Sequence, residues 1–295
     1  MVPDLKTLPQ PIAVVCHDAG AANIVLAEML AAPDVNFLPV MQGPAARLFT
    51  DSGFAASTLL TLDGALLHAK SVLSGTGWAS ELEHAARCRA KAMHLKSIAV
   101  IDHWVNYADR FERRGLYQLP DEIWVSDTYA LEISLNAFAG QVIGLLPNRY
   151  LQTQIKNIAP ASSSLMGQLL YVLEPLRFSW PGCQQAGEFE ALDYFVNNLG
   201  RIKSAQKLQI RLRPHPSDAP GKYNTWLEAN QGRGISMDDS ASLSQAIGRA
   251  QWVAGCETAA MVVALAAGRN VVSTLPPDAP RCRLPHTGIV HLRNL

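Results

Sequence analysis

The sequence predicts an α/β protein of two domains, each built around a parallel β-sheet. Its 295 residues are about twice the usual domain size of roughly 150 residues. Short apolar runs of strand length alternate with helical stretches in both halves, and the middle of the chain lacks this alternation. Strands that alternate with helices form right-handed βαβ units, which build parallel sheets.

The first half contains the elements of one such domain. Ile12–Cys16 is an uninterrupted apolar run, as in a strand that is buried on both faces. Ser80 and Glu83 have the spacing of a capping box, which predicts a helix that runs toward Lys96. Helices are also expected over 24–30 and 45–49. The further strands are expected at 35–40, 98–101, 122–125 and 142–146.

The interval 147–167 has prolines and a serine run without a clear period, so we expect it to form the crossover between the domains. The predicted domains are residues 1–155 and 156–295. In the second domain, helices are expected over 189–199, 242–250 and 259–267, and Gly268 suits the left-handed residue that ends the last helix. Its strands are expected at 169–173, 208–212, near 235, at 252–254 and at 270–273.

Composition limits the partners and the compartment. Lys and Arg together number 25, as do Asp and Glu, so no net charge attracts nucleic acid or anionic lipid. No run approaches the roughly 18 apolar residues that span a bilayer, and the first residues lack the pattern of a signal peptide. The five cysteines are scattered without zinc-site spacing. We expect a cytoplasmic protein with no nucleic-acid partner and at most peripheral membrane contact.

A first group of polar residues follows the strand at 208–212. Prolines on both sides of His215 fix the backbone and hold the imidazole stiffly. Beside the Arg213 guanidinium and the Ser217 hydroxyl, this imidazole suits a phosphate through charge-assisted hydrogen bonds. The alternative is a proline-rich strand exit with a surface histidine.

A second group lies at 253–261, where a strand, a glycine turn and a helix start follow one another. The unpaired N–H groups of a helix start bind phosphate well, and the Thr258 hydroxyl adds a donor. Glu257 suits a ribose diol, as acids do in dinucleotide-binding folds. Glu174 follows the first strand of this domain and is expected to reach the same ligand. The alternative is a capped helix with a favourable acid in its first turn.

Candidate catalytic residues follow the first strand of the chain. His17 or Asp18 is placed to act as a general base on an acceptor hydroxyl. Small residues such as Gly20 let a ligand approach the backbone, and we assign Gly20 and Asn23 to the acceptor site. The alternative is a polar helix cap.

The residues after the strand at 98–101 are further candidates. Asp102 and His103 are the other candidates for the base. Trp104, Asn106 and Tyr107 combine aromatic rings with polar groups, which suits a sugar, so we assign them to the acceptor. The alternative is a packed loop with structural polar contacts.

Two isolated residues complete the predicted acceptor site. Trp78 follows a Gly-Thr-Gly turn, and Asn148 lies where a hinge would meet a cleft between the domains. No Asp-x-Asp pair or HExxH motif occurs, so we expect no metal ligands, no cofactor and a metal-independent reaction.

The Arg-Pro-His-Pro-Ser loop at 213–217, together with the Gly-Cys-Glu-Thr helix start at 255–258, resembles bacterial GT-B-type glycosyltransferases. The resemblance is strongest to the sialyltransferase-like and CDP-glycerol glycerophosphotransferase-like groups, in which an HP motif and a later Ser or Thr hold the donor nucleotide. It implies an α/β fold with two Rossmann-like domains that face a cleft, the acceptor in the first domain and the nucleotide donor in the second. The residues that it assigns to the donor are Arg213, His215, Ser217, Glu257 and Thr258.

The leading hypothesis is therefore a glycosyltransferase. It would transfer a sugar or related group from a nucleotide-activated donor to a hydroxyl of a carbohydrate or lipid-linked acceptor, in surface polysaccharide or glycoconjugate synthesis. One alternative is a nucleotide-sugar hydrolase or epimerase on the same fold. Another is a non-catalytic protein that binds nucleotides or sugars.

Overall fold

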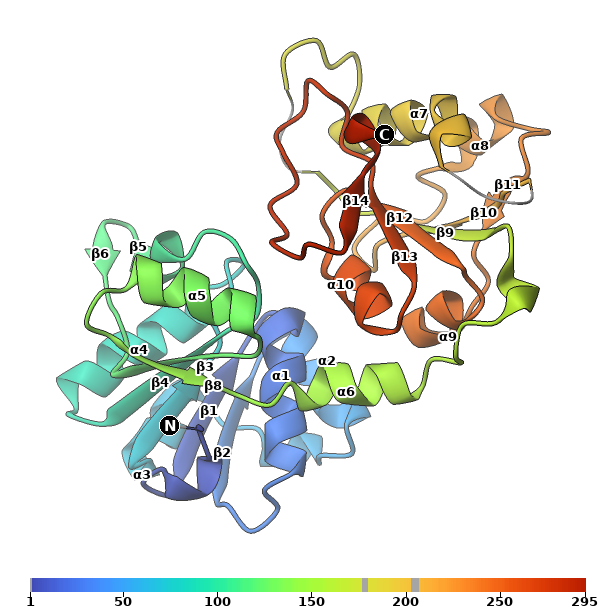
Figure 1. The fold of residues 1–295 in the computed structure, drawn as a ribbon. Coiled ribbons are helices and arrows are strands. Elements are labelled where there is room, and N and C mark those ends of the chain that lie inside the picture. The colour runs from blue at the N-terminus through green and yellow to red at the C-terminus, as the bar shows by residue number, and fades with distance from the viewer. Residues whose placement is uncertain (1, 177–179, 203–206) are drawn as a thin grey trace. The chain divides into compact units, whose positions relative to one another are not determined.

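The computed structural model describes residues 2–176, 180–202 and 207–295, and the chain divides into two compact units. The units are Met1–Tyr150 and Leu151–Leu295. Each has a six-stranded sheet in which every pair of neighbouring strands is parallel (Figure 1). The predicted boundary at 155/156 falls near the end of helix α6 (Arg149–Lys156).

The sheet of the first unit has the strand order β2-β1-β3-β4-β7-β8. Its strands are β1 (Ile12–Cys16), β2 (Phe37–Met41), β3 (Ser71–Ser74), β4 (Lys96–Ile101), β7 (Glu122–Val125) and β8 (Val142–Leu145). The helices are α1 (Ala19–Leu30), α2 (Gly43–Asp51), α3 (Leu62–His68), α4 (Leu82–Ala92) and α5 (Thr128–Ala137). A hairpin of β5 (Glu112–Arg113) and β6 (Leu116–Tyr117) lies outside this sheet.

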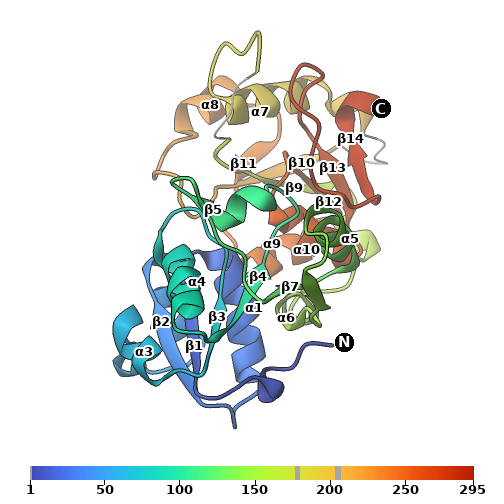
Figure 2. The same cartoon turned by 90° about the vertical axis from the view of Figure 1, so that its left-hand side faces the viewer.

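Both faces of this sheet are covered by helices, as Figure 2 shows from the side. Ile12 and Val14 of β1 pack in one core with α1 and α2, whereas Ala13 and Val15 pack in another with α3 and α4. Alternate side chains of a strand point to opposite faces. A strand that is buried on both faces therefore needs apolar residues throughout, which explains the uninterrupted run in β1.

The sheet of the second unit has the strand order β11-β10-β9-β12-β13-β14, which is the order of the Rossmann fold. Helices lie on both of its faces (Figure 1). Its strands are β9 (Gln168–Val172), β10 (Gln209–Arg213), β11 (Ile235–Met237), β12 (Trp252–Gly255), β13 (Asn270–Ser273) and β14 (Ile289–His291). The helices are α7 (Gly187–Asn197), α8 (Asn224–Ala229), α9 (Leu243–Gly248) and α10 (Ala259–Ala266).

Short 3₁₀ helices complete the secondary structure. They are Leu5–Thr7, Ala56–Thr58, Ala108–Phe111, Ser163–Leu165, Leu199–Arg201 and Leu292–Asn294. In the described part of the chain, no helix is both long and apolar enough to span a lipid bilayer.

Chain order reverses once in each sheet. The reversal lies between β1 and β3 in the first unit and between β9 and β12 in the second. Open α/β sheets bind ligands at such reversals, beside the carboxyl ends of the strands. Each unit therefore has one position where a ligand site is expected.

Two predictions about local structure are wrong. Ser80 and Glu83 do not form a capping box, because Glu83 accepts hydrogen bonds from the backbone of His17 and Gly77 instead, and Ser80 Oγ accepts from Leu82 N at 3.0 Å. The crossover is not wholly irregular, because it contains helix α6, which begins at Arg149. The guanidinium of Arg149 pairs with the Glu28 carboxylate of α1.

Candidate functional site

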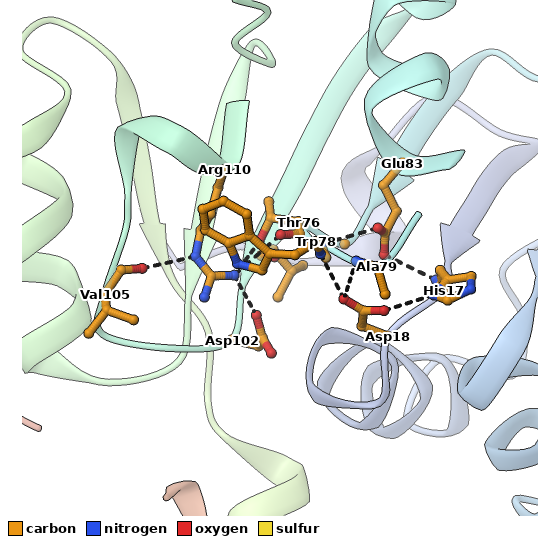
Figure 3. Close-up of polar contacts among 12 residues, drawn as sticks. His17, Asp18, Thr76, Trp78, Ala79, Glu83, Asp102, Val105 and Arg110 are labelled. Carbon is orange, nitrogen blue, oxygen red and sulfur yellow. Dashed lines mark hydrogen bonds and ion pairs between the residues drawn. The ribbon is translucent and has the colours of Figure 1, made fainter. Parts of the chain in front are cut away.

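In the first unit, the loops after β1 and β3 meet at the chain reversal (Figure 3). Asp18 Oδ1 lies 2.7 Å from Nδ1 of His17, and Asp18 Oδ2 accepts from the backbone N–H of Trp78 at 2.8 Å. Burial raises the pKa of Asp18, but the hydrogen bonds from His17 and Trp78 outweigh it, so the pKa is lowered. Asp18 is therefore a weak base that orients His17, and His17 is the better candidate for proton transfer.

Asp102 directly follows β4 and is held by Arg110. Arg110 Nη1 donates to Asp102 Oδ1 at 3.0 Å and to Thr76 Oγ1 at 3.1 Å (Figure 3). A Cβ atom on Gly20 would overlap Oδ2 of Asp102, so only glycine leaves room for this carboxylate at the first turn of α1. The positive end of the helix dipole favours an anion at this position. The structure thus brings the predicted residues Gly20 and Asp102 together.

Glu83 ties the loops after β1 and β3 to each other. Its side chain is buried, and it accepts from His17 N and Gly77 N, both at 3.1 Å. Burial raises the pKa of Glu83, although the hydrogen bond from His17 N acts in the opposite direction. A Cβ on Gly75 would lie 2.5 Å from Glu83 Oε1, so the Gly-Thr-Gly stretch makes room for this acid. The sequence indicated the glycines but not their partner.

Trp78 already has cationic neighbours. The guanidinium carbons of Arg110 and Arg113 lie 5.9 and 5.3 Å from its ring centroid, within the range of cation–π contacts. The side chain is still 42% exposed. Stacking of Trp78 on an acceptor sugar stays a prediction.

Tyr107 is a core residue in this structure. Its ring is 5% exposed and packs on Phe138, and its hydroxyl donates to the carbonyl of Ala130 at 3.4 Å. A buried ring of this kind does not meet an acceptor, so we leave Tyr107 out of the proposed site.

The other predicted acceptor residues are spread over several elements. The Trp104 indole donates to Asp127 at 2.8 Å, and its ring is next to His103, with the centroids 5.3 Å apart. Asn106 has a left-handed backbone with φ of 58°. The half-buried Asn23 and Asn148 lie in α1 and after β8. Their roles stay predictions.

In the second unit, His215 is oriented by its own loop after β10. Ser217 N donates to Nδ1 of His215 at 3.2 Å, and Ser217 Oγ lies 2.7 Å from the same nitrogen. A nitrogen that accepts from a backbone amide has no proton, so the neutral imidazole has its proton on Nε2. His215 therefore presents an N–H donor, and Ser217 orients it.

Asp218 fixes the backbone of this loop. Its carboxylate accepts from His215 N at 2.9 Å and from Lys222 Nζ at 2.7 Å, and Lys222 also pairs with Glu188 at 2.8 Å. Burial raises the pKa of Asp218, but the bonds from Lys222 and His215 outweigh it and lower the pKa. The rigidity of the loop thus comes from Asp218 as well as from the two prolines, and no local sequence pattern indicated the role of Asp218.

Arg213, the last residue of β10, is hydrogen-bonded to the loop that follows β11. Its Nη1 donates to Asp238 Oδ2 at 2.6 Å and to the carbonyl of Ser240 at 3.0 Å. These bonds fix the guanidinium beside the carboxyl end of β10. A contact with a donor stays a prediction.

Glu174 and Glu257 meet at the chain reversal of the second sheet. Glu257 N donates to Glu174 Oε1 at 2.6 Å. Burial raises the pKa of Glu174 to about 7, and the charge of Glu257 adds to this effect. The Thr258 side chain accepts from Ala260 N, so Thr258 caps α10 as in the alternative given above.

Arg283 was missed by the sequence analysis. Its backbone N and Nε donate to the carboxylate of Glu257, each at 3.0 Å. The residue lies between β13 and β14, in a stretch without periodicity, so no local pattern indicated its position. Among the residues that the structure describes, no group of three or more His, Cys, Asp or Glu side chains is arranged to hold a metal ion.

Comparison with known proteins shows the fold. No protein-family model and no curated protein match the chain in sequence. Among solved structures, S. aureus MnaA in complex with UDP is similar over 89% of this chain and 78% of that one, with a TM-score of 0.60 and 10% identity. A candidate UDP-N-acetylglucosamine 2-epimerase from Listeria monocytogenes is similar over 88% and 78%, with a TM-score of 0.59 and 14% identity.

A third similar structure is the glycotransferase of kitacinnamycin. The similarity covers 92% of this chain and 82% of the glycotransferase chain, with a TM-score of 0.51 and 12% identity. The predicted α/β class with two Rossmann-like domains of GT-B type is thereby confirmed. The resemblance to the sialyltransferase-like and glycerophosphotransferase-like groups stays a prediction.

Proposed function

We propose that this chain is an enzyme that acts on nucleotide-activated sugars, with glycosyl transfer to a hydroxyl acceptor as its reaction. The observation that carries the proposal is the orientation of His215: Nδ1 accepts from Ser217 N, so the proton of the neutral imidazole lies on Nε2. In a chain with this fold, a rigid N–H donor beside the carboxyl end of β10 fits a donor phosphate.

The proposed role of His215 follows from where charge develops. When the bond between the sugar carbon and the phosphate oxygen breaks, the phosphate gains negative charge. A fixed N–H donor stabilises that charge without having to reorganise. Ser217 and Asp218 support this role, because they orient the ring and its backbone.

The first unit supplies the candidates for the base. We propose that His17, oriented by Asp18, takes the proton of the acceptor hydroxyl, with Asp102 as the second candidate. Histidine is the side chain that most often acts as a general base in enzymes, and the hydrogen bond that Nδ1 of His17 donates to the Asp18 carboxylate leaves Nε2 as the basic nitrogen.

Epimerisation or hydrolysis of a nucleotide sugar is the second candidate function. The first unit gathers Asp18, Glu83 and Asp102 around the loop of His17. A reaction that removes and returns protons on a sugar needs paired acid and base groups of this kind. The similar Listeria protein is described as a candidate UDP-N-acetylglucosamine 2-epimerase, which is in keeping with this alternative.

The test is to incubate the protein with a panel of UDP-, CDP-, GDP- and ADP-sugars, with and without sugar acceptors, and to analyse the products. Transfer predicts nucleotide release that depends on an acceptor. Epimers or free sugar without an acceptor favour the second candidate. If no nucleotide sugar is consumed in any mixture, both are wrong.

His215→Ala should lower turnover by about 10²- to 10³-fold, because a preorganised donor to the developing charge is lost. The matched control is His68→Ala, which removes an exposed histidine at the end of α3. Steady-state kinetics on variants with unchanged circular dichroism measure the effect. Equal turnover of the two variants would exclude His215 from the mechanism.

A further inference from the structure

A long segment joins β13 to β14 (Figure 1). It brings Arg283 to Glu257, which follows β12. There the guanidinium meets Glu257, whose side chain is 7% exposed. Backbone N and Nε of Arg283 each donate to the carboxylate at 3.0 Å, and Nη2 donates to Oε1 as well. Both oxygens of Glu257 thus hold the arginine.

This arrangement gives the two residues unequal roles. Glu257 is buried and engaged by Arg283, whereas the Arg283 side chain is 46% exposed. The bonds to Glu257 use the Nε and Nη2 edge of the guanidinium, which fixes the plane of the fork. A fixed and accessible guanidinium matches the geometry of phosphate oxygens, and it loses little conformational entropy on binding.

We propose, building on the proposed function, that Arg283 binds the diphosphate of the nucleotide donor and that Glu257 is its positioning residue. The guanidinium is anchored to the residue that precedes Thr258, the cap of α10, so an anion on Arg283 is close to the positive end of that helix. This assignment replaces the direct contact between Glu257 and a ribose diol that was expected from the sequence.

Glu174 is a second acid, beside Glu257, that would oppose such a ligand. Its carboxyl accepts from Glu257 N at 2.6 Å, and burial raises its pKa to about 7. A neighbouring phosphate favours the neutral form of this carboxyl, which is already accessible near neutral pH. Protonation of Glu174 removes one of the two carboxylate charges next to an anion on Arg283.

Isothermal titration calorimetry of the full chain tests the proposal with three kinds of probe. These are nucleoside diphosphates (UDP, CDP, GDP and ADP), the matching nucleosides, and inorganic pyrophosphate. The variants are Arg283→Gln, Arg283→Lys and Glu257→Gln. The matched control is Arg281→Gln, because Arg281 is an exposed arginine in the same segment.

Arg283→Gln should weaken binding of the preferred nucleoside diphosphate and of pyrophosphate by about 10- to 100-fold, the usual effect of a charge-assisted hydrogen bond, and should leave nucleoside binding unchanged. Arg283→Lys keeps the charge but loses the fork, so its loss should be intermediate. Arg281→Gln should bind every probe like the wild type. If Arg283→Gln does not fold because Glu257 is left unpaired, the double variant Glu257→Gln with Arg283→Gln removes both charges and takes its place.

The outcomes separate this inference from the proposed function. Unchanged diphosphate affinity in Arg283→Gln, or an equal loss for nucleoside and diphosphate, overturns the role of Arg283 while nucleotide binding stands. Arg283-dependent binding of pyrophosphate, with no nucleotide bound more tightly, supports the anion site but contradicts a nucleotide donor. Failure of the wild type to bind any probe overturns both.

Discussion

Carboxylates at the ends of both sheets accept hydrogen bonds from the backbone of neighbouring loops. Glu83 accepts from His17 and Gly77, and Glu174 accepts from Glu257. A buried carboxylate needs such donors, since burial without hydrogen bonds is costly. These acids hold the loops that present the candidate ligand-binding groups.

Glu174→Gln should remove a pH dependence of stability. Because burial raises the folded pKa of Glu174 from 4.5 to about 7, its contribution is fully present below pH 4.5 and is lost as pH rises through 7. The loss is on the order of 3 kcal/mol of unfolding free energy. Urea unfolding of wild type and variant from pH 5 to 8 measures this loss. If the unfolding free energy changes with pH in the same way for both proteins, Glu174 is ionised throughout this range.

Gly20→Ala should displace Asp102, since the added Cβ overlaps its carboxylate oxygen. A displacement of about 1 Å in a catalytic group lowers turnover roughly 10²-fold. The control is Gly200→Ala, where a Cβ meets no atom within 4 Å. Steady-state kinetics measure the turnover of both variants. Turnover of Gly20→Ala equal to that of the wild type would argue against a role for Asp102.

At this scale, sequence reasoning found residues that belong to a local pattern. The His215 loop could be predicted because prolines and a hydroxyl surround the imidazole within a few positions. Arg283 could not, because its partner Glu257 is distant in sequence and only the return of the chain after β13 brings them together. The role of Glu83 was misread for the same reason.

Among the elements, the strands that are buried on both faces were the easiest to predict. β3 was missed because it begins and ends with Ser71 and Ser74, and both serines are buried. Ser71 Oγ donates to the carbonyl of Pro9 at 2.6 Å, which satisfies the hydroxyl inside the core. α6 was missed because its helical period occurs in a largely polar segment.

Glu83→Ala should loosen the junction of α4 with the loops after β1 and β3. The backbone N–H groups of His17 and Gly77 would lose their acceptor, and each buried unsatisfied donor costs about 1–3 kcal/mol. The expected loss of unfolding free energy is about 3 kcal/mol. The control Glu81→Ala, at an exposed position, should change it by less than about 0.5 kcal/mol. Similar urea midpoints for the two variants would contradict this role.

The whole molecule consists of two units with separate cores and the same design. In each, the chain reverses beside its first strand, and loops with titratable groups follow the carboxyl ends there. This architecture could be predicted from the alternation of strands and helices. The candidate binding groups are positioned by side-chain pairs from segments that are distant in sequence. The alternation of strands and helices does not predict such pairs.

The most direct test of a nucleotide-sugar enzyme is a crystal structure with the nucleoside diphosphate that raises the melting temperature most. We expect the phosphates within hydrogen-bonding distance of His215 Nε2 and the Arg283 guanidinium, beside the carboxyl ends of β9, β10 and β12. A nucleotide bound in the first unit, or no nucleotide that stabilises the protein, would contradict this expectation.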